Sequence, residues 1–579
     1  MSPAIVTLIV FAVYIIGYKY YAGFLGSKLF NLRADFKTPA HTKRDNIDFI
    51  PTPTYILWGH HYASIAGLSP ILGPAVAVIW GWLPALLWVV LGSVLIGAVH
   101  DFAALVLSVR ANGLSIGSIT EHLMGRRAKL LFLLIIFFLF SLAMGVFVLV
   151  LGYLFSAGGF PQVIAPSTGI MVIAMIMGYL YYKKNIPLKY MGVISFFIVL
   201  LFLWWGQHPS SYETFNFHDT QKAPSITSWK IVMLCYGFAA SILPVWLLLQ
   251  SRDFLNSLLL YLSMGLLYIG FFLSDVSFSA PAVQFNAANA PPVFPFLFIV
   301  IACGAISGFH SLVSSGTTAK QLNKETDAKI IGYGGMIGES MLGLIAILAT
   351  TTTFASFEEW NALYCDWNQL ASLGKKVGIF IEGGAKFLSS TGISIEFGKG
   401  LLAFVVVSFA LTSLDSATRL LRYNIEEMAT FIKEDKIRRF FQNRYISSFL
   451  AVLAIGFFAF FEIKDASGNS LPAGKVLWQL FGTTNQILGA LALFLASIYL
   501  YSRKKNPLYT LIPMIFVLFS TIIAMIENII LFIEKDGMAD ILVVAVVLLV
   551  ITVWLLYEAS MAIIRYKNKK TDSLDIIIY

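Results

Sequence analysis

Apolar blocks of about 20 residues recur along almost the whole chain, and their length limits the possible folds more than any other feature. A helix of about 20 apolar residues crosses a hydrocarbon core roughly 30 Å thick. Inside lipid every backbone polar group must be satisfied within the protein, so long apolar runs form helices. A transmembrane β-barrel needs short segments that alternate in polarity, and the sequence contains none. We therefore predict an all-α polytopic membrane protein.

The composition excludes a water-soluble globule. The chain has 579 residues, of which 58% are hydrophobic and only 12% are charged, whereas about a quarter of a typical soluble chain is charged. The net charge of +9 reflects basic loops, so we expect a lipid bilayer and no nucleic acid as partner. The three cysteines are scattered without a Cys-x-x-Cys pair, and His-Glu-x-x-His is missing, so no metal and no cofactor are expected.

Fifteen spans are predicted from the apolar blocks, and most of the 40 Lys and Arg residues fall in alternate connecting segments. Such a bias places those segments in the cytoplasm, with the N-terminus outside and the C-terminus inside. The predicted spans cover residues 3–24, 63–82, 84–108, 130–155, 167–182, 188–206, 230–249, 256–274, 293–317, 330–353, 400–418, 445–461, 475–501, 508–533 and 540–564.

The second span is interrupted, because two prolines and three glycines fall between Gly59 and Pro74. Proline removes a backbone donor and clashes with the preceding helical turn. A helix that breaks at membrane depth leaves free amides and carbonyls, which are tolerated where they line a cavity. Gly and Pro are also common in ordinary membrane helices.

The seventh span has a similar flaw, since small residues precede Pro244 in the segment that begins at Tyr236. Broken helices at corresponding places in two inverted halves point to the binding site of a transporter. We therefore predict a 5+5 inverted repeat of the kind found in APC and LeuT-like transporters, flanked by one helix before and four after. The resulting regions are 1–54 (first span and cytoplasmic loop), 55–206 (repeat 1), 230–420 (repeat 2) and 421–579 (four helices and a cytoplasmic tail). The outside loop 354–399 is either a lid or an ordinary connector.

Ionisable groups inside the spans are candidates for function, because they are costly in lipid. His60 and His61 open the second span, where they could carry a proton or simply lie at the interface. His100 and Asp101 are adjacent, so they point about 100° apart on a helix. For Asp101 we expect a structural ion pair with Arg110 or another helix.

Two carboxylates lie deeper in later spans. Glu339 lies among small residues without a partner on its own helix, and it is the leading candidate for a protonatable carboxylate. Asp415 lies four residues before Arg419, a spacing that permits an intrahelical ion pair.

The ninth span ends in a cluster of hydroxyls at 311–318, which includes Ser314 and Ser315 and follows His310. Hydroxyl oxygens suit a small cation, although they also bond to the preceding helical turn. The segment is therefore a candidate site for a coupling ion.

Several segments resemble the carbon starvation protein A (CstA) family, in order along residues 50 to 490. They are Gly59-His-His-Tyr-Ala-Ser-Ile-Ala-Gly, Pro244-Val-Trp-Leu-Leu-Leu-Gln-Ser-Arg-Asp-Phe, Ala302-Cys-Gly-Ala-Ile-Ser-Gly-Phe-His-Ser, Ser314-Ser-Gly-Thr-Thr-Ala-Lys, Glu325-Thr-Asp-Ala-Lys and Leu477-Trp-Gln-Leu-Phe-Gly-Thr-Thr-Asn-Gln.

The resemblance implies a transporter of the bacterial inner membrane that takes up peptides or pyruvate and takes part in the response to carbon starvation. It also implies the ten-helix core of the APC superfamily, whose sodium-coupled members place a pair of hydroxyls where Ser314 and Ser315 lie. Two departures stand out: His100 replaces a glutamine of the family, and the chain is shorter than the long members, mainly between spans 10 and 11.

The predicted mechanism is symport by alternating access, driven by H⁺ or Na⁺. The carboxylate of the solute would lie near the start of the half-helix between Gly67 and Gly73, where free amides favour an anion. The alternatives are a membrane-embedded metal-dependent enzyme and a channel. The predicted substrate-binding residues are His60, His61, Ser64, Gly67, Ser69, Gly73, Tyr236, Ser241 and Trp246. The predicted coupling residues are Ser314, Ser315, His310, Glu339 and Asp415.

Overall fold

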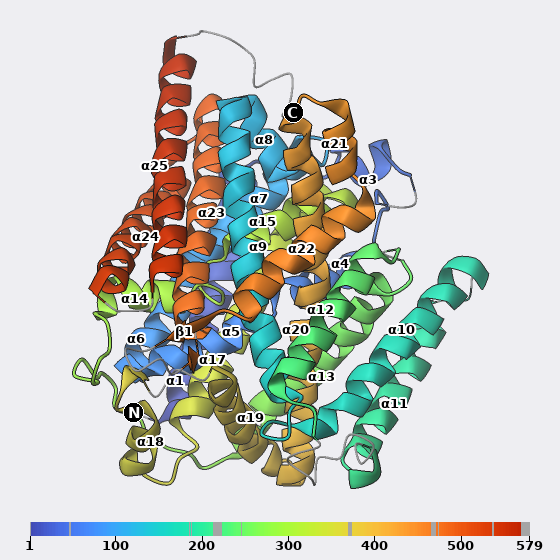
Figure 1. Cartoon of the computed structure of the whole chain (residues 1–579), viewed down its shortest axis with the longest axis vertical. Coiled ribbons are helices and arrows are strands. Elements are labelled where there is room, and N and C mark those ends of the chain that lie inside the picture. Colours follow the sequence, from blue (N-terminus) through green and yellow to red (C-terminus); the bar gives the residue numbers. More distant parts are fainter. Residues whose placement is uncertain are drawn as a thin grey trace.

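A computed structural model describes residues 2–45, 48–184, 186, 188–211, 223–244, 246–368, 373–464, 470–472, 474–534 and 538–568. The described residues are almost entirely helical, as predicted. Figure 1 shows the helices packed in one bundle, with its longest axis vertical. A single hairpin of two short strands, β1 (Glu462–Lys464) and β2 (Ser470–Pro472), departs from the all-α prediction.

Ten helices in the described part of the chain are long and apolar enough to cross a membrane, and one bent pair is an eleventh candidate. The chain is thus a multi-span membrane protein. The other predicted spans correspond to shorter or interrupted helices, so the count of fifteen and the orientation stay predictions. The helices of the first half are α1 (Pro3–Ile16), α2 (Ala22–Phe24), α3 (Pro39–Thr42), α4 (Thr54–Ile65), α5 (Ser69–Ala77), α6 (Trp82–Leu87), α7 (Ala98–Arg110), α8 (Ile116–Met124), α9 (Arg126–Leu154), α10 (Ile164–Lys184), α11 (Leu188–Gly206), α12 (Ile226–Ile242) and α13 (Leu249–Leu273).

The second half contains the helices that complete the bundle. They are α14 (Val293–Val300), α15 (Gly308–Val313), α16 (Ala319–Gln321), α17 (Gly334–Thr351), α18 (Phe357–Tyr364), α19 (Leu373–Ser389), α20 (Ile395–Met428), α21 (Asp435–Phe441), α22 (Arg444–Ala459), α23 (Gly474–Ser502), α24 (Leu508–Glu534) and α25 (Ala539–Asn568). Figure 1 shows α18 and α19 at one end of the long axis and α8 and α21 at the other. The outside loop 354–399 and the cytoplasmic loops are predicted to face opposite sides of the membrane, and this topology stays a prediction.

The predicted interruption of the second span is present. Helix α4 ends at Ile65, α5 begins at Ser69, and the two segments differ in direction by 49°. Pro70 lies in the first turn of α5, where a missing backbone N–H costs nothing. The break therefore lies where glycine and proline fall in the sequence.

The predicted second interruption is in the wrong place. Helix α12 ends at Ile242, and residues 243–248 connect it to α13, so Pro244 lies between two helices and not within one span. The second interrupted span is formed instead by α14 and α15, which are separated by the unwound residues 301–307. Gly304 lies in this segment with a φ of +88°, which favours glycine.

The two interruptions pack directly on each other. A Cβ atom at Gly73 of α5 would lie 2.6 Å from the carbonyl oxygen of Val300, and one at Gly304 would lie 3.6 Å from the Cα of Pro70. Only glycine at position 73 lets the two backbones approach this closely. The two unwound segments therefore meet inside the bundle.

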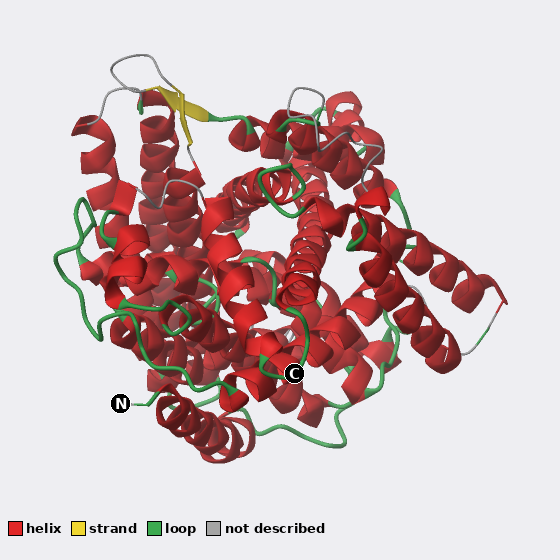
Figure 2. Cartoon of the chain, turned by 90° about the horizontal axis from the view of Figure 1, so that it is seen from below, coloured by secondary structure: helices red, strands yellow, loops and turns green. Residues whose placement is uncertain are grey.

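Three further features frame this centre. The long helices α9 and α20 pack against each other beside it. The hairpin of α10 and α11 projects from the side of the bundle in both views (Figures 1 and 2). The predicted outside loop contains α18 and α19, and Tyr364 of α18 donates a hydrogen bond of 2.9 Å to the carbonyl of Ala75 in α5. This loop therefore docks on the half-helix that follows the first break.

Candidate functional site

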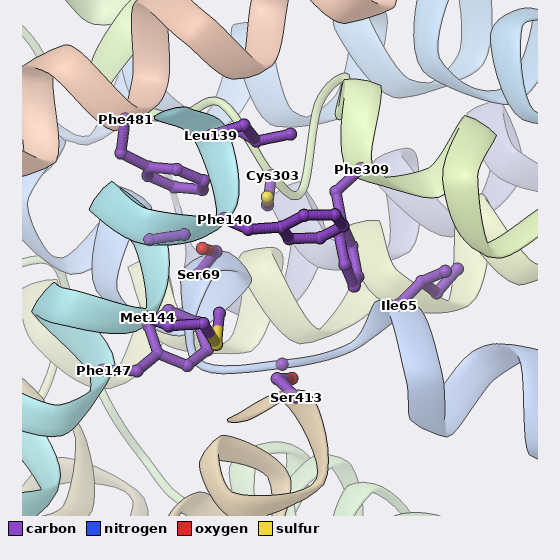
Figure 3. Close-up of a pocket in the computed structure, with 12 residues that line it drawn as sticks. Ile65, Ser69, Leu139, Phe140, Met144, Phe147, Cys303, Phe309, Ser413 and Phe481 are labelled. Carbon is purple, nitrogen blue, oxygen red and sulfur yellow. The ribbon is translucent and has the colours of Figure 1, made fainter. Parts of the chain in front are cut away.

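A small cavity of about 30 Å³ lies where the two interrupted spans meet α9, α20 and α23 (Figure 3). Gly67 and Ser69 reach it from the first break, Cys303 from the second and Ser413 from α20, and the rest of its wall is apolar. The apolar lining residues are Ile65, Leu139, Phe140, Ala143, Met144, Phe147, Phe309 and Phe481. A space of this size admits water but not a solute of several heavy atoms.

The predicted residues of the first break have different roles. Gly67 and Ser69 line the cavity, and Gly73 packs against the second interrupted span. Ser64 donates a hydrogen bond to the carbonyl of His60, within its own helix. The Nδ1 atom of His61 lies 2.9 Å from the hydroxyl of Thr318.

The predicted residues of the seventh span do not line the cavity. Ser241 donates to the carbonyl of Phe238, and Trp246 lies in the connection to α13, beneath the ammonium group of Lys183. Tyr236 instead donates a hydrogen bond of 2.7 Å to the carboxylate of Asp415. The proline-based inference failed here because Pro244 ends a helix and does not interrupt one.

A group of five residues, which we name the arginine cluster, contains the buried Arg252, Asp253 and Asp415 together with the half-buried Tyr236 and His60. The guanidinium of Arg252 contacts both the carboxylate of Asp415 and the hydroxyl of Tyr236. His60 Nδ1 lies 3.2 Å from Asp253 Oδ2. Because Arg252 and Asp253 are neighbours, the first turns of α13 are tied to α4, α12 and α20 at once.

The expected pair of Asp415 with Arg419 does not form. Arg419 donates to the backbone carbonyls of Ala240 and Leu243, at 2.6 and 2.8 Å, where α12 ends. Those carbonyls have no partner within their own helix, so they compete well for the guanidinium. Asp415 pairs with Arg252 instead.

A second buried group, which we name the cysteine cluster, contains Cys303, His310 and Glu339 with His100 and Asp101. Asp101 bridges two histidines, with His100 Nδ1 at 2.7 Å from one oxygen and His310 Nδ1 at 2.7 Å from the other. His310 Nε2 lies 3.2 Å from Glu339 Oε2. Cys303 belongs to the unwound segment of the second break and also lines the cavity.

Two expectations about this group can be compared with the structure. His100 Nδ1 lies 2.7 Å from Asp101 Oδ1, so the two side chains contact each other although they are adjacent on the helix. Of the two partners expected for Asp101, the one on another helix is present, His310 of α15, whereas Arg110 pairs with Glu325 at 2.6 Å.

The serine pair of the ninth span lies beside these residues but gives no ion site by itself. Ser315 donates to the carbonyl of Ser311, at 2.7 Å, and accepts from the backbone amide of Ile116. The hydroxyl of Ser314 is buried, and no hydrogen-bond partner is found for it among the described residues. The sodium assignment for this pair therefore stays a prediction.

Sequence reasoning missed the roles of Arg252, Asp253 and Cys303. All three lie in segments that carry the family resemblance, which was the available signal. Their partners lie on other helices, and spacing along the chain does not reveal such contacts.

Comparisons with known proteins agree with the resemblance. The family model described as "Carbon starvation protein CstA" matches residues 2–524. The peptide transporter CstA of Campylobacter jejuni is 31% identical, over 93% of this chain and 82% of that protein. The pyruvate/proton symporter BtsT of Escherichia coli is 30% identical, over 88% of this chain and 79% of that protein.

Solved structures with a similar arrangement are also transporters. A manganese transporter of Eremococcus coleocola is 13% identical with a TM-score of 0.46, over 90% of this chain and 98% of that chain. MhsT in complex with L-phenylalanine is 14% identical with a TM-score of 0.43, over 81% of this chain and 99% of that chain. The sequence matches cover most of the chain, and the protein therefore belongs to the carbon starvation protein CstA family.

Proposed function

We propose that the protein is a secondary active transporter that imports a small organic solute with a carboxylate, pyruvate or a short peptide, by proton-coupled alternating access. Relatives across this family are named peptide transporters and a pyruvate/proton symporter, so a transporter is favoured over an enzyme. The observation that carries the proposal is the meeting of two interrupted spans around a small cavity. Such pairs of discontinuous helices form the binding sites of many transporters. We place the protein in the inner (plasma) membrane of a bacterium, as the family membership suggests.

The inverted repeat is better assigned to other helices than the sequence suggested. We treat the projecting hairpin 161–206 as an insertion. Four spans then separate the two interrupted spans 54–80 and 293–313, namely 82–110, 126–154, 226–242 and 249–273. With four spans between them, the two interrupted spans are the first helices of two repeats of five spans each. We therefore assign the second repeat to the residues from 293 onward.

The carboxylate of the solute would bind at the start of α5, beside Gly67 and Ser69. The first amides of a helix lack internal partners, and the helix dipole favours an anion there. The hydroxyls of Ser69 and Ser413 add polar contacts in an otherwise apolar wall. The apolar wall suits the carbon skeleton of the solute and excludes water.

The coupling proton would bind in the arginine cluster. Its direct contacts join two carboxylates, of Asp253 and Asp415, to one guanidinium and one histidine. The two carboxylates carry one negative charge more than the guanidinium balances, and an excess charge is costly inside a membrane protein. Binding of one proton removes it. The proton weakens the contacts that hold α13 to α4 and α20, so the half-helix before the first break can move.

The two ends of the cavity would then open alternately. At one end the loop 354–399 docks on α5, through Tyr364 and through Trp367, whose ring centre lies 5.4 Å from that of Trp80. At the other end the arginine cluster holds α4. Binding of solute and proton would break the contacts of the loop and those of the arginine cluster one after the other.

The test is uptake into proteoliposomes under an imposed proton or sodium gradient, with pyruvate compared against di- and tripeptides. We expect a proton gradient alone to drive accumulation of one of these solutes. Counterflow should accompany it, because a carrier exchanges solute and a channel does not. No accumulation of any candidate under either gradient would exclude symport, and transport without counterflow would identify a channel.

A further inference from the structure

We propose that the cysteine cluster binds one divalent transition-metal ion of the Zn²⁺ type, through Cys303 Sγ, His310 Nε2 and a carboxylate oxygen of Glu339. The three donor atoms lie within 4.8 Å of one another, and all three residues are buried. They come from three places in the fold: the unwound segment of the second break, α15 and α17. Sequence spacing predicted no metal site because the ligands lie on separate elements.

The donor atoms of His310 and Glu339 lack hydrogen-bond partners among the described residues. His310 Nε2 and both carboxylate oxygens of Glu339 are buried, and none makes a hydrogen bond of good geometry within the described part of the chain. Buried polar atoms normally have partners. An ion between these atoms would satisfy all of them at once.

Asp101 prepares His310 to act as a ligand. Its carboxylate lies 2.7 Å from His310 Nδ1, so Nδ1 carries the proton and donates it, and the lone pair of Nε2 faces Glu339. A carboxylate behind a histidine in this way is the common second contact of a metal-bound imidazole. Asp101 is itself held by His100 on its other oxygen.

The sulfur of Cys303 has surroundings that suit a thiolate. The side-chain amide of Asn485 donates to it at 3.5 Å. The thiol of Cys303 donates to the hydroxyl of Ser307 at 3.2 Å, and loss of the thiol proton would free that hydroxyl to donate in return. Hydrogen bonds of this kind stabilise sulfur that is coordinated to a metal.

The charges of the cluster are compatible with a divalent cation. The cluster holds two carboxylates, of Asp101 and Glu339, and among the described residues no lysine or arginine forms an ion pair with either. With Cys303 as a thiolate the group would carry three negative charges, of which a divalent ion would balance two. A set of one sulfur, one nitrogen and one oxygen ligand favours Zn²⁺ or a similar ion over Mg²⁺ or Ca²⁺.

The proposed site adjoins the cavity, because Cys303 lines both (Figure 3). Once bound, it would join the unwound residues 301–307 to α15 and α17. The ion would thus fix the shape of the second break, a role that does not depend on which solute is transported.

The test begins with the metal content of the purified full-length protein, measured by mass spectrometry after washing with a weak chelator. We expect about one ion per chain. The same protein, stripped and titrated with Co²⁺, should show the charge-transfer absorption of a cobalt–thiolate bond in the near ultraviolet. The chain offers a matched control, since it has three cysteines: the double variant Cys235→Ser, Cys365→Ser should keep the absorption, and Cys303→Ser should lose it.

Two further variants keep the test independent of folding and of transport. Asp101→Asn should retain the absorption while the affinity for Co²⁺ falls about 10- to 100-fold. Metal should raise the melting temperature of the wild type but not of Glu339→Gln. No stoichiometric binding of Zn²⁺ or Co²⁺ by folded wild-type protein, or a cobalt–thiolate band that survives in Cys303→Ser, would overturn the proposal. The cobalt absorption and the melting temperature do not depend on transport, so failure of the transport assay would not affect this test.

Discussion

The arginine cluster and the cysteine cluster both contain two buried carboxylates and at least one histidine, yet they differ in the cation that accompanies them. Arg252 supplies a permanent positive charge to the first cluster. In the second cluster histidines and a thiol take its place. In the arginine cluster the guanidinium is always charged and balances only one of the two carboxylates, so the cluster can accept one proton. The imidazole, thiol and carboxylate groups of the cysteine cluster are ligands for a metal ion. This difference underlies our two proposals, a coupling proton in the arginine cluster and a metal ion in the cysteine cluster.

The largest expected effect comes from exchanging one aspartate for asparagine in each cluster. Asp415→Asn mimics the protonated acid, so it should reduce gradient-driven accumulation to background while counterflow continues. Asp101→Asn should weaken metal binding, and Asp415→Asn should leave it unchanged. Uptake and Co²⁺ titration on both variants measure this.

Asp435→Asn is a matched control for the uptake measurement, because Asp435 is exposed and pairs with Arg438 within α21. It should behave as the wild type. If Asp415→Asn accumulates solute normally under a proton gradient, the arginine cluster is not the coupling site and the contrast between the clusters fails.

The second largest effect concerns stability. Arg252→Met should destabilise the protein by about 3–5 kcal/mol, because it leaves the buried carboxylate of Asp415 without its cation. The double variant Arg252→Met, Asp415→Leu should recover much of this loss, since no unpaired charge remains. Chemical unfolding in detergent gives both values. Equal losses in the single and double variants would show that the ion pair contributes little.

Lys376 can be compared with Arg252, because both are buried cations. Lys376 lies outside the membrane spans and has no carboxylate partner among the described residues. Its ammonium group donates to the carbonyl of Leu363 and lies 4.1 Å from the ring centre of Tyr364. Burial lowers the pKa of Lys376 from 10.5 to about 8, although Cys365 acts in the opposite direction.

Below pH 8 Lys376 is charged in the folded and the unfolded protein, and the folded state bears the full cost of burial, at most about 3 kcal/mol. That cost falls as the pH rises from about 8 to 10.5, where the unfolded chain also loses the proton. Lys376→Met removes the charge, so its stability relative to the wild type should be greatest below pH 8 and should decline toward pH 10.5. Thermal melting across this range measures the trend, and a difference independent of pH would contradict it.

The smallest effect tests the backbone of the second break. Gly304→Ala should cost about 1–2 kcal/mol, because an alanine at a φ of +88° is strained. A Cβ atom there meets Pro70 at an ordinary 3.6 Å, so the cost is conformational. Gly265→Ala is the control, since nothing lies within 4 Å of its added Cβ in the interior of α13. That variant should gain about 0.5–1 kcal/mol, and an equal response at both sites would argue against a special backbone at Gly304.

The sequence predicted a helical protein with many membrane spans and the first break, because both depend on local composition. Apolar length defines a span, and the glycines and prolines between Gly59 and Pro74 leave few alternatives to an interruption. The second break escaped prediction because it contains no proline. Residues 301–307 unwind around Gly304, and their partner is the first break, which is far away in the chain.

Candidate residues could be selected from the sequence, but their partners could not. Buried acids and histidines such as His60, His310, Glu339 and Asp415 stand out because they are rare in lipid-spanning segments. Which acid meets which cation depends on how helices pack. Asp415 has a suitable arginine one turn away, yet it pairs with Arg252 on another helix.

The most direct test of the central claim is the proton flux that accompanies solute flux. Proteoliposomes loaded with a pH-sensitive dye receive a gradient of the transported solute at equal pH on both sides, with the membrane potential clamped. The wild type should carry about one proton inward with each solute molecule, and Asp415→Asn should exchange solute without moving protons. Solute entry without a proton in the wild type, or an unchanged proton flux in Asp415→Asn, would contradict the account.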